Sequence, residues 1–301
     1  MIHTVEDNLF LIDLDQAREG FRDFISSWLL ITPTHTILVD PGPRSTIPVL
    51  KEALDRLAIG RIDHILLTHI HIDHAGGVGL LLDDFPGAMV TCHSRGVKHM
   101  IHPEKLWKAS QKVLGDLADL YGEIAPVPEH HIGFSNDIPL GSQTICVVET
   151  PGHAPHHLSF LLDDILFAGE VAGVTCPVPD GLYLRPTTPP VFNPTVYKNS
   201  LERVASLNAG VICFAHYGMR HDVSHVIDAA LAQIDTWHDI VRRHYRMAGS
   251  FFEERVFDDI VNNDPLMAHF TDLPGDIRYR EREFSLNSIR GIRQYLDEKD
   301  T

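Results

Sequence analysis

Residues 68–77 read Thr-His-Ile-His-Ile-Asp-His-Ala-Gly-Gly and bring four potential metal ligands into one short loop. These are His69, His71, Asp73 and His74. The loop follows the apolar run 62–67, which predicts a strand, and alternate residues of an extended chain point to the same side. The first three ligands are therefore expected on one side, and the glycines after His74 allow a turn into a helix. Imidazole and carboxylate groups without a nearby thiolate suit zinc, iron or manganese, so the loop predicts a metal site.

Short apolar runs and stretches with helical spacing alternate on both sides of this loop. Strands are expected at 25–32, 36–40, 62–67, 88–93, 143–149, 157–162, 165–169 and 211–215. Helices are expected at 43–58, 76–84 and 195–207, with one or two more in 95–122. Six prolines in 176–194 argue against regular structure there, and everything from residue 221 is expected to be helical, with breaks near Gly249 and Pro265. This order predicts an α/β core over 1–220 and a helical C-terminal appendage over 221–301.

The composition narrows the classes of partner and the compartment. Lysine and arginine total 25 against 41 aspartate and glutamate residues, a formal net charge of −16 that repels phosphate backbones and anionic lipid. We therefore expect a small-molecule substrate, no nucleic acid and no membrane, with a homo-oligomer as an open alternative. The four cysteines form no CxxC pair and are expected to be reduced thiols. The N-terminal residues lack the basic start and apolar run of a signal peptide, so a cytoplasmic location is expected.

Four further motifs flank the His-rich loop, one before it and three after it. They are Val-Asp-Pro-Gly at 39–42, Thr-Pro-Gly-His at 150–153, Phe-Ala-Gly-Glu at 167–170 and Phe-Ala-His-Tyr-Gly at 214–218. Together with residues 68–77 they resemble the motif series of the metallo-β-lactamase superfamily, in its glyoxalase II-like branch with the HxHxDH motif. The resemblance spans residues 39–218. It implies an αββα four-layer sandwich with the C-terminal helical appendage attached.

The resemblance also implies a ligand set for two divalent metal ions, with zinc expected and iron or manganese as alternatives. One ion would be held by His69, His71 and His153, and the other by Asp73, His74 and His216. Glu170 stands where the family usually has a bridging aspartate, and its extra methylene changes the reach of that carboxylate. Asp40 and His157 are expected to support the ligands from behind. Asp73 and Asp40 are the candidate catalytic acids.

A dinuclear site of this kind predicts a hydrolase that uses a metal-bridging hydroxide on an ester-like bond. The substrate would be a thioester, lactone or phosphoester in a small soluble metabolite. Gly173 stands where acyl-homoserine lactonases typically carry tyrosine, and the basic Asn-Pro-Phe signature of glyoxalase II is absent. Two alternatives stay open: an iron-dependent redox enzyme of the same fold, similar to sulfur dioxygenases, and a non-catalytic metal-binding sensor.

The proline-rich loop and the C-terminal helices are expected to form the substrate pocket. Candidate residues on its rim are Tyr183, Arg185, Phe192 and Tyr217. An arginine near the metals would suit an acidic substrate tail. In the last helix, Leu286, Ile289, Ile292 and Leu296 recur at helical spacing, which predicts that this helix docks on the core.

Overall fold

The structure is a computed structural model that describes residues 1–245 and 251–299. Within these ranges the N-terminal half forms one sheet whose strands lie in space in their sequence order. They are β1 (Ile2–Glu6), β2 (Leu9–Asp13), β3 (Ser26–Ile31), β4 (Thr36–Val39), β5 (His64–Leu66), β6 (Met89–Thr91) and β7 (Ile132–Gly133). The pairs from β1 to β4 are antiparallel, and the pairs from β4 to β7 are parallel.

The second sheet has the spatial order β15-β14-β11-β10-β9-β8. Its strands are β8 (Asp137–Leu140), β9 (Gln143–Glu149), β10 (Leu158–Leu162), β11 (Ile165–Gly169), β14 (Val211–Phe214) and β15 (Met219–Arg220). Here β11 and β14 run parallel, whereas their other neighbours are antiparallel. A small antiparallel pair, β12 (Val174–Thr175) with β13 (Leu184–Arg185), lies beside this sheet.

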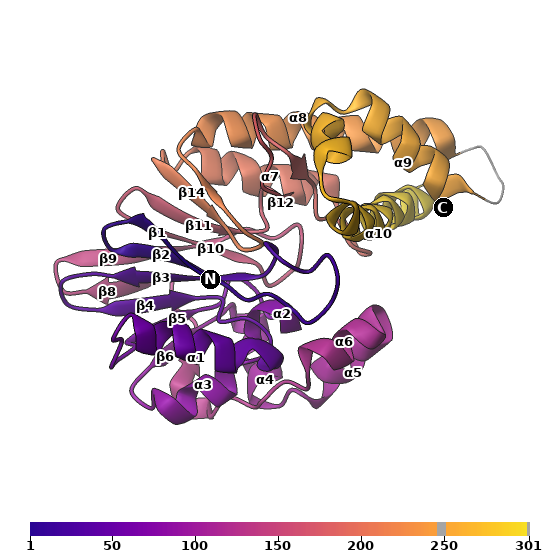
Figure 1. Cartoon of the computed structure of the whole chain (residues 1–301). Helices are drawn as coiled ribbons and strands as arrows, with labels where there is room; N and C mark the ends of the chain where they lie inside the picture. The colour runs from indigo at the N-terminus through magenta and orange to yellow at the C-terminus, as the bar shows by residue number, and fades with distance from the viewer. Residues whose placement is uncertain (246–250, 300–301) are drawn as a thin grey trace.

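Helices cover the outer faces of both sheets (Figure 1). The first sheet carries η1 (Arg44–Thr46), α1 (Ile47–Arg56), α2 (Ile72–Ala75), α3 (Val78–Asp84), α4 (Ser94–Ile101), α5 (Glu104–Leu114), α6 (Asp116–Tyr121) and η2 (Glu129–His131). The second carries α7 (Pro194–Ala205), α8 (Val223–Tyr245), α9 (Phe252–Asn263), η3 (Pro265–Asp272) and α10 (Gly275–Lys299). The layer order helix, sheet, sheet, helix confirms the predicted sandwich and its C-terminal helices.

The alternation of side chains along the strands explains why the layers form. In β11, Ile165 and Phe167 point into the core between the two sheets, while Leu166 and Ala168 point into the core under α7–α10. The latter core is continuous from the strands to the last helix, where Ile289 is fully buried. The C-terminal helices therefore share their packing with the sandwich.

Several expectations need correction. Residues 95–122 hold three helices among the described residues, because Pro103 precedes α5 and Gly115, at φ 55°, separates α5 from α6. The proline-rich stretch 176–194 contains β13, because residues 180–185 lack proline and keep the N–H groups that a ladder needs. The sequence patterns also do not predict the short strands β1, β2, β7, β8, β12 and β15.

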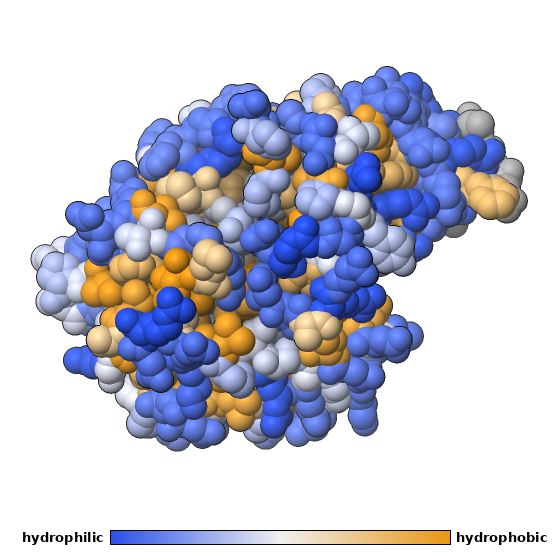
Figure 2. All heavy atoms as spheres, viewed as in Figure 1, coloured by the Kyte–Doolittle hydropathy of each residue, from blue (hydrophilic) through white to orange (hydrophobic). Residues whose placement is uncertain are grey.

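The predicted break near Pro265 is confirmed, since η3 separates α9 from α10 there. The predicted break at Gly249 lies outside the described residues. In the part of the chain that the structure describes, no helix combines the length and apolarity needed to cross a bilayer. Figure 2 shows a mainly hydrophilic surface whose outline is indented between the region of α10 and that of α5 and α6.

Candidate metal centre

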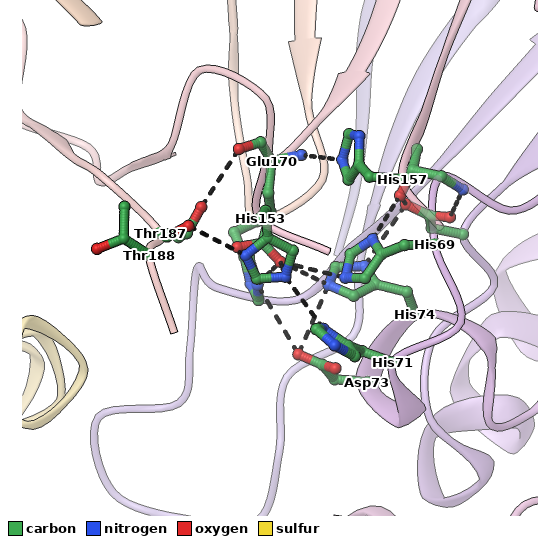
Figure 3. Close-up of polar contacts among 12 residues, drawn as sticks. His69, His71, Asp73, His74, His153, His157, Glu170, Thr187 and Thr188 are labelled. Atoms are coloured by element: carbon green, nitrogen blue, oxygen red, sulfur yellow. Dashed lines mark hydrogen bonds and ion pairs between the residues drawn. The ribbon is translucent and has the colours of Figure 1, made fainter. Parts of the chain in front are cut away.

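Loops from both sheets converge at one edge of the sandwich (Figure 3). The loop after β5 supplies His69, His71, Asp73 and His74, and the β9–β10 loop supplies His153 and His157. Glu170 directly follows β11, and His216 follows β14. Because β4 runs parallel to β5, and β11 to β14, the carboxyl ends of these strands meet at the same edge. Residues far apart in the sequence are thereby brought together.

The His-rich loop is extended only as far as His71, which has φ −63° and ψ 149°. The chain then turns into α2 at Ile72, so the expected alternation does not continue to Asp73. Gly76 permits this early turn, because a Cβ there would lie 2.4 Å from the Ile72 carbonyl oxygen. The turn separates Asp73 and His74 from the first two histidines and directs them to a second cluster.

The potential ligand atoms form two clusters, each with all its atoms within 4.8 Å of one another. The first consists of His69, His71, His153 and Glu170, and the second of Asp73, His74 and His216. In the first cluster, His153 Nε2 lies only 3.0 Å from His71 Nδ1. The clusters correspond to the two ligand sets expected from the sequence, with Glu170 added to the first.

Glu170 lies between the two clusters. Its Oε1 atom is 3.4 Å from the Nε2 atoms of His69 and His153, which belong to the first cluster. The same oxygen is 3.4 Å from His74 Nε2 and 3.2 Å from His216 Nε2, which belong to the second. One carboxylate oxygen therefore faces both clusters, as a bridging group must.

The donor set fits divalent metal ions. Within the described residues, the buried Nε2 atoms of His69 and His74 have no hydrogen-bond partner. Leaving buried polar atoms unsatisfied costs roughly 1–3 kcal/mol each, so such atoms call for a partner. A divalent cation accepts several imidazole lone pairs together with carboxylate oxygens, which no single protein group can do. The residues present therefore fit two such ions.

Asp40 holds the His-rich loop from behind. The backbone N–H and the hydroxyl of Thr68 donate to its two carboxylate oxygens at 2.8 and 2.6 Å. Thr68 Oγ1 in turn lies 3.0 Å from His69 Nδ1, and Asp40 Oδ2 lies 3.5 Å from His74 Nδ1. The Asp40 carboxylate is buried and engaged by Thr68, a position from which it can support the ligands. Its roles as a support and as a catalytic acid stay predictions.

His157 supports Glu170 through the backbone. The Glu170 N–H donates to His157 Nε2 at 2.9 Å, and the opposite ring nitrogen lies 2.8 Å from Thr150 Oγ1. Gly169, at φ 62°, makes this approach possible, because a Cβ there would lie 2.4 Å from His157 Nε2. The glycine before the acid is thus required by both conformation and space.

The surroundings set the charge of these groups. Burial lowers the pKa of the His69 and His71 imidazoles well below the usual value, and neighbouring histidines add to the effect. Burial alone would raise the pKa of Glu170, but His153 and His216 hold it well below its ordinary range. His74 is the exception, because Asp73 and Asp40 outweigh its burial and raise its pKa well above the usual value. Metal binding requires neutral imidazoles and an ionised carboxylate, so His74 must lose a proton when a metal binds.

Comparison with known proteins agrees with this arrangement. The family model of the metallo-beta-lactamase superfamily matches residues 20–216, which include every residue of the two clusters. The chain belongs to the metallo-β-lactamase superfamily.

Relatives within the superfamily match to different extents. A metallo-beta-lactamase fold-containing protein of Sulfurisphaera tokodaii is 32% identical over 207 residues, covering 66% of this chain and 75% of that protein. The hydroxyacylglutathione hydrolase of Aeromonas hydrophila is 31% identical over 147 residues, covering 48% of this chain and only 44% of that enzyme. The present chain therefore matches less than half the length of this hydrolase.

Solved structures of superfamily members extend the likeness over most of the chain. The crystal structure of the archaeal protein from Sulfolobus tokodaii has a TM-score of 0.69 and 26% identity, covering 94% of this chain and 98% of that one. A family protein from Thermus thermophilus has a TM-score of 0.68 at 21% identity, covering 98% of this chain and 95% of that one. At 21% identity, the likeness to the Thermus thermophilus protein shows a common fold only.

Three of the four residues expected on the pocket rim have buried side chains. Tyr183 and Arg185 are buried, and both donate to Glu281 Oε2 of α10, at 3.1 and 2.8 Å. Phe192 is buried against Tyr197. The sequence does not reveal that a buried acid of α10 binds the polar pair, and the role of these three residues in substrate binding stays a prediction. Tyr217, next to His216, is partly exposed.

Other contacts of the centre were missed by sequence reasoning. The Thr187 carbonyl oxygen lies 3.3 Å from His153 Nδ1, and the Thr187 hydroxyl donates to the Glu170 carbonyl oxygen at 3.2 Å (Figure 3). The ring of Phe24 stacks on His216 with centroids 4.3 Å apart. Position in the proline-rich loop was a usable signal for Thr187, whereas nothing in the sequence singles out Phe24.

Proposed function

We propose that this superfamily member is a metal-dependent hydrolase that holds two divalent cations and cleaves an ester-like bond in a small molecule. The position of Glu170 Oε1, within 3.4 Å of imidazole nitrogens from both clusters, carries this proposal. The names of its relatives support it, because they include hydroxyacylglutathione hydrolases and a probable metallo-hydrolase.

The proposed ligands follow from the two clusters. His69, His71 and His153 would hold one ion, and Asp73, His74 and His216 would hold the other. Glu170 Oε1, within 3.4 Å of imidazole nitrogens from both clusters, would contribute to either. Zinc fits this nitrogen and oxygen donor set, and iron and manganese are the alternatives. When bound, two such ions lower the pKa of a water molecule and stabilise negative charge on the oxygen of the scissile group.

The remaining roles belong to side chains of the protein. Asp73 has a side chain 17% exposed, against 4% for Glu170, so Asp73 is the acid of the centre that solvent reaches more readily. We assign Asp73 the holding of a proton for the leaving group. Asp40 and His157 keep the ligands in place through the Thr68 hydroxyl and the Glu170 N–H.

Among the ester-like substrates, the thioester is the first to test, because several relatives are named hydroxyacylglutathione hydrolase. A lactone and a phosphoester follow. The net charge of −16 supports a small-molecule substrate over nucleic acid or an anionic membrane.

The decisive experiment combines metal content with a substrate panel. We expect two metal ions per chain by elemental analysis and turnover of at least one thioester, lactone or phosphodiester. Glu170→Gln keeps the shape and removes the charge, so it should lose one ion and reduce kcat at least tenfold. Glu170→Asp shortens the side chain and should also lower activity, since the backbone is held in place by His157.

The matched control is Glu202→Gln, at an exposed position on α7, which should leave metal content and turnover unchanged. Full loading and normal turnover in Glu170→Gln would refute the bridging role. One iron per chain with oxygen consumption and no hydrolysis would instead support the redox alternative. Metal binding without either reaction would support the sensor.

A further inference from the structure

His216 differs from the other histidines of the two clusters in how its ring is held. His153 Nδ1 has the Thr187 carbonyl oxygen at 3.3 Å, and His69 Nδ1 has the Thr68 hydroxyl at 3.0 Å. Within the part of the chain that the structure describes, His216 Nδ1 is buried without a hydrogen-bond partner. His74 Nδ1 also lacks a hydrogen bond there, but it faces the Asp40 carboxylate, with Oδ2 3.5 Å away. Metal-binding histidines are usually oriented by such a bond on the far nitrogen. Something else must orient this ring.

Phe24 occupies the position from which it can do so. Its ring is 1% exposed and stacks on the His216 imidazole at a centroid distance of 4.3 Å and an interplanar angle of 21°. The guanidinium carbon of Arg280 lies over the same phenyl ring, 4.1 Å from its centroid. Since two groups cannot share one face at these distances, the phenyl ring lies between the imidazole and the guanidinium.

The loop that carries Phe24 is clamped to α10. Arg280, buried in α10, donates from Nη1 to the carbonyl oxygens of Gly20 and Arg22, at 2.6 and 3.1 Å. Arg22 forms an ion pair with Asp276 near the start of α10. Gly20 packs so closely that a Cβ there would lie 2.4 Å from the Asp276 carbonyl oxygen. Figure 1 shows this loop, which follows β2, reaching α10.

Arg280 is itself fixed by buried partners. Its Nε atom donates to Glu281 Oε1 at 3.0 Å, and its Nη2 atom lies 3.3 Å from the sulfur of Cys176. Glu281 also accepts from Arg185 on β13. A continuous set of contacts therefore runs from β13 through α10 to Phe24 and on to His216.

We propose that Phe24 is a positioning residue that fixes the plane of the His216 imidazole, and that α10 acts on the second metal cluster through it. The proposal rests on the proposed function, in which His216 is a metal ligand. Stacking replaces the missing hydrogen bond: it restricts rotation of the ring and keeps Nε2 directed at Glu170 and Asp73, 3.2 and 3.8 Å away.

The test is a cobalt titration of the metal-free full chain, followed by visible absorption. Phe24→Leu keeps an apolar side chain but removes the flat ring. Binding of the first cobalt ion, the first step, should be unchanged. The affinity for the second cobalt ion, the second step, should fall about 10- to 100-fold, the usual effect of losing a group that orients a ligand. The absorption band of the second ion should also change shape, because the imidazole is no longer held in one plane.

The matched control is Phe21→Leu. Phe21 is buried in the same aromatic group, edge-on to Phe24 at 5.6 Å, and belongs to the same loop. Its loss should lower the thermal stability of the metal-free chain as much as the loss of Phe24 does, without changing the second binding step. An unchanged second step in Phe24→Leu, or equal weakening in Phe21→Leu, would overturn the proposal.

Two further variants keep the result interpretable. His216→Ala should abolish the second step; if wild type binds only one ion, or if His216→Ala still binds two, the proposed function itself fails. If Phe24→Leu does not fold, Arg280→Met removes the guanidinium from the far face while Glu281 keeps Arg185 as its partner. Arg280→Met should weaken the second step in the same direction, and an unaltered second step would refute the proposal.

Discussion

At the scale of single residues, Glu170 shows how a longer side chain is accommodated. Its backbone N–H is held by His157 and its carbonyl oxygen by the Thr187 hydroxyl, so the main chain cannot move toward the histidines. The extra methylene spans this gap, and Oε1 reaches both clusters. A change from aspartate to glutamate is therefore compatible with bridging where the backbone is anchored further back.

Gly169→Ala tests that anchor. The new Cβ would meet the His157 ring at 2.4 Å, and a left-handed conformation costs an L-residue about 1–2 kcal/mol. We expect a loss of roughly 3 kcal/mol or more in the free energy of unfolding, measured with urea on the metal-free chain, together with reduced metal content. Gly141→Ala is the control, because Gly141 has φ 74° and a Cβ added there would have no neighbour within 4 Å. It should show the conformational cost alone.

At the scale of secondary-structure elements, α10 shows what a sequence pattern can and cannot predict. Its docking was predicted from apolar residues at helical spacing, and Leu286, Ile289 and Ile292 are indeed buried. The same helix also buries Arg280 and Glu281 almost completely. Charged residues rarely lie in a core unless they are paired, so no periodicity argument would have placed them there. Their partners lie on other elements, and only the assembled fold reveals them.

The edge strands of the sheets also show where prediction from a sequence pattern fails. The interior strands β5, β10, β11 and β14 are apolar enough to be recognised, and the residues of the two clusters lie in motifs adjoining them. The edge strand β1 contains polar residues and β15 has only two residues, so their ladders depend on the neighbouring strand more than on their own sequence. The members of the two clusters could thus be predicted, whereas Phe24 and the Thr187 contacts could not.

The lowered pKa of Glu281, the buried acid of α10, indicates how the stability of the fold depends on pH. Burial alone would raise the pKa of Glu281, but Arg185 and Arg280 lower it from 4.5 to about 2. A carboxyl whose pKa is lower in the folded than in the unfolded state stabilises the fold at pH values above its unfolded-state pKa. This contribution is lost as the pH falls toward the folded-state pKa. The stabilising effect should therefore be complete above pH 4.5 and disappear between pH 4.5 and about 2.

Glu281→Gln should accordingly be less stable than wild type at pH 7, with the difference shrinking below pH 4.5. The measurement is urea unfolding of the chelated, metal-free chain at several pH values. Glu283→Gln, on the same helix but with an exposed side chain, serves as the control and should differ little from wild type at any pH. A constant difference between Glu281→Gln and wild type down to about pH 2 would contradict the assignment.

At the scale of the whole molecule, the metal centre joins the two sheets. One sheet contributes the loop after β5, and the other contributes Glu170 and His216. The predicted division into 1–220 and 221–301 remains a prediction, although the core under α7–α10 runs across it. The expectations of a cytoplasmic location, of no nucleic acid or membrane partner, and of a possible homo-oligomer also stay predictions.

Because the centre joins the sheets, metal removal should destabilise the entire fold. A ligand that binds only the folded state at about 1,000 times its dissociation constant adds about 4 kcal/mol to stability. We expect chelation to lower the melting temperature of wild type by several degrees and excess zinc to restore it, as measured by differential scanning fluorimetry. In His216→Ala the shift should be smaller. An identical melting temperature with and without metal would show that the centre does not hold the sheets together.

The clamp between the loop after β2 and α10 has a consequence for synthesis on the ribosome. Arg22 and its partner Asp276 are 254 residues apart, so the loop is synthesised well before the helix that clamps it. At about 5–20 residues per second, the interval is roughly 13 to 50 s. By then His69, His71 and His153 have long emerged and can already capture an ion. If the proposed ligands bind two ions, the cluster that contains His216 should therefore be completed later than the first, because Phe24 is clamped only after α10 has been made.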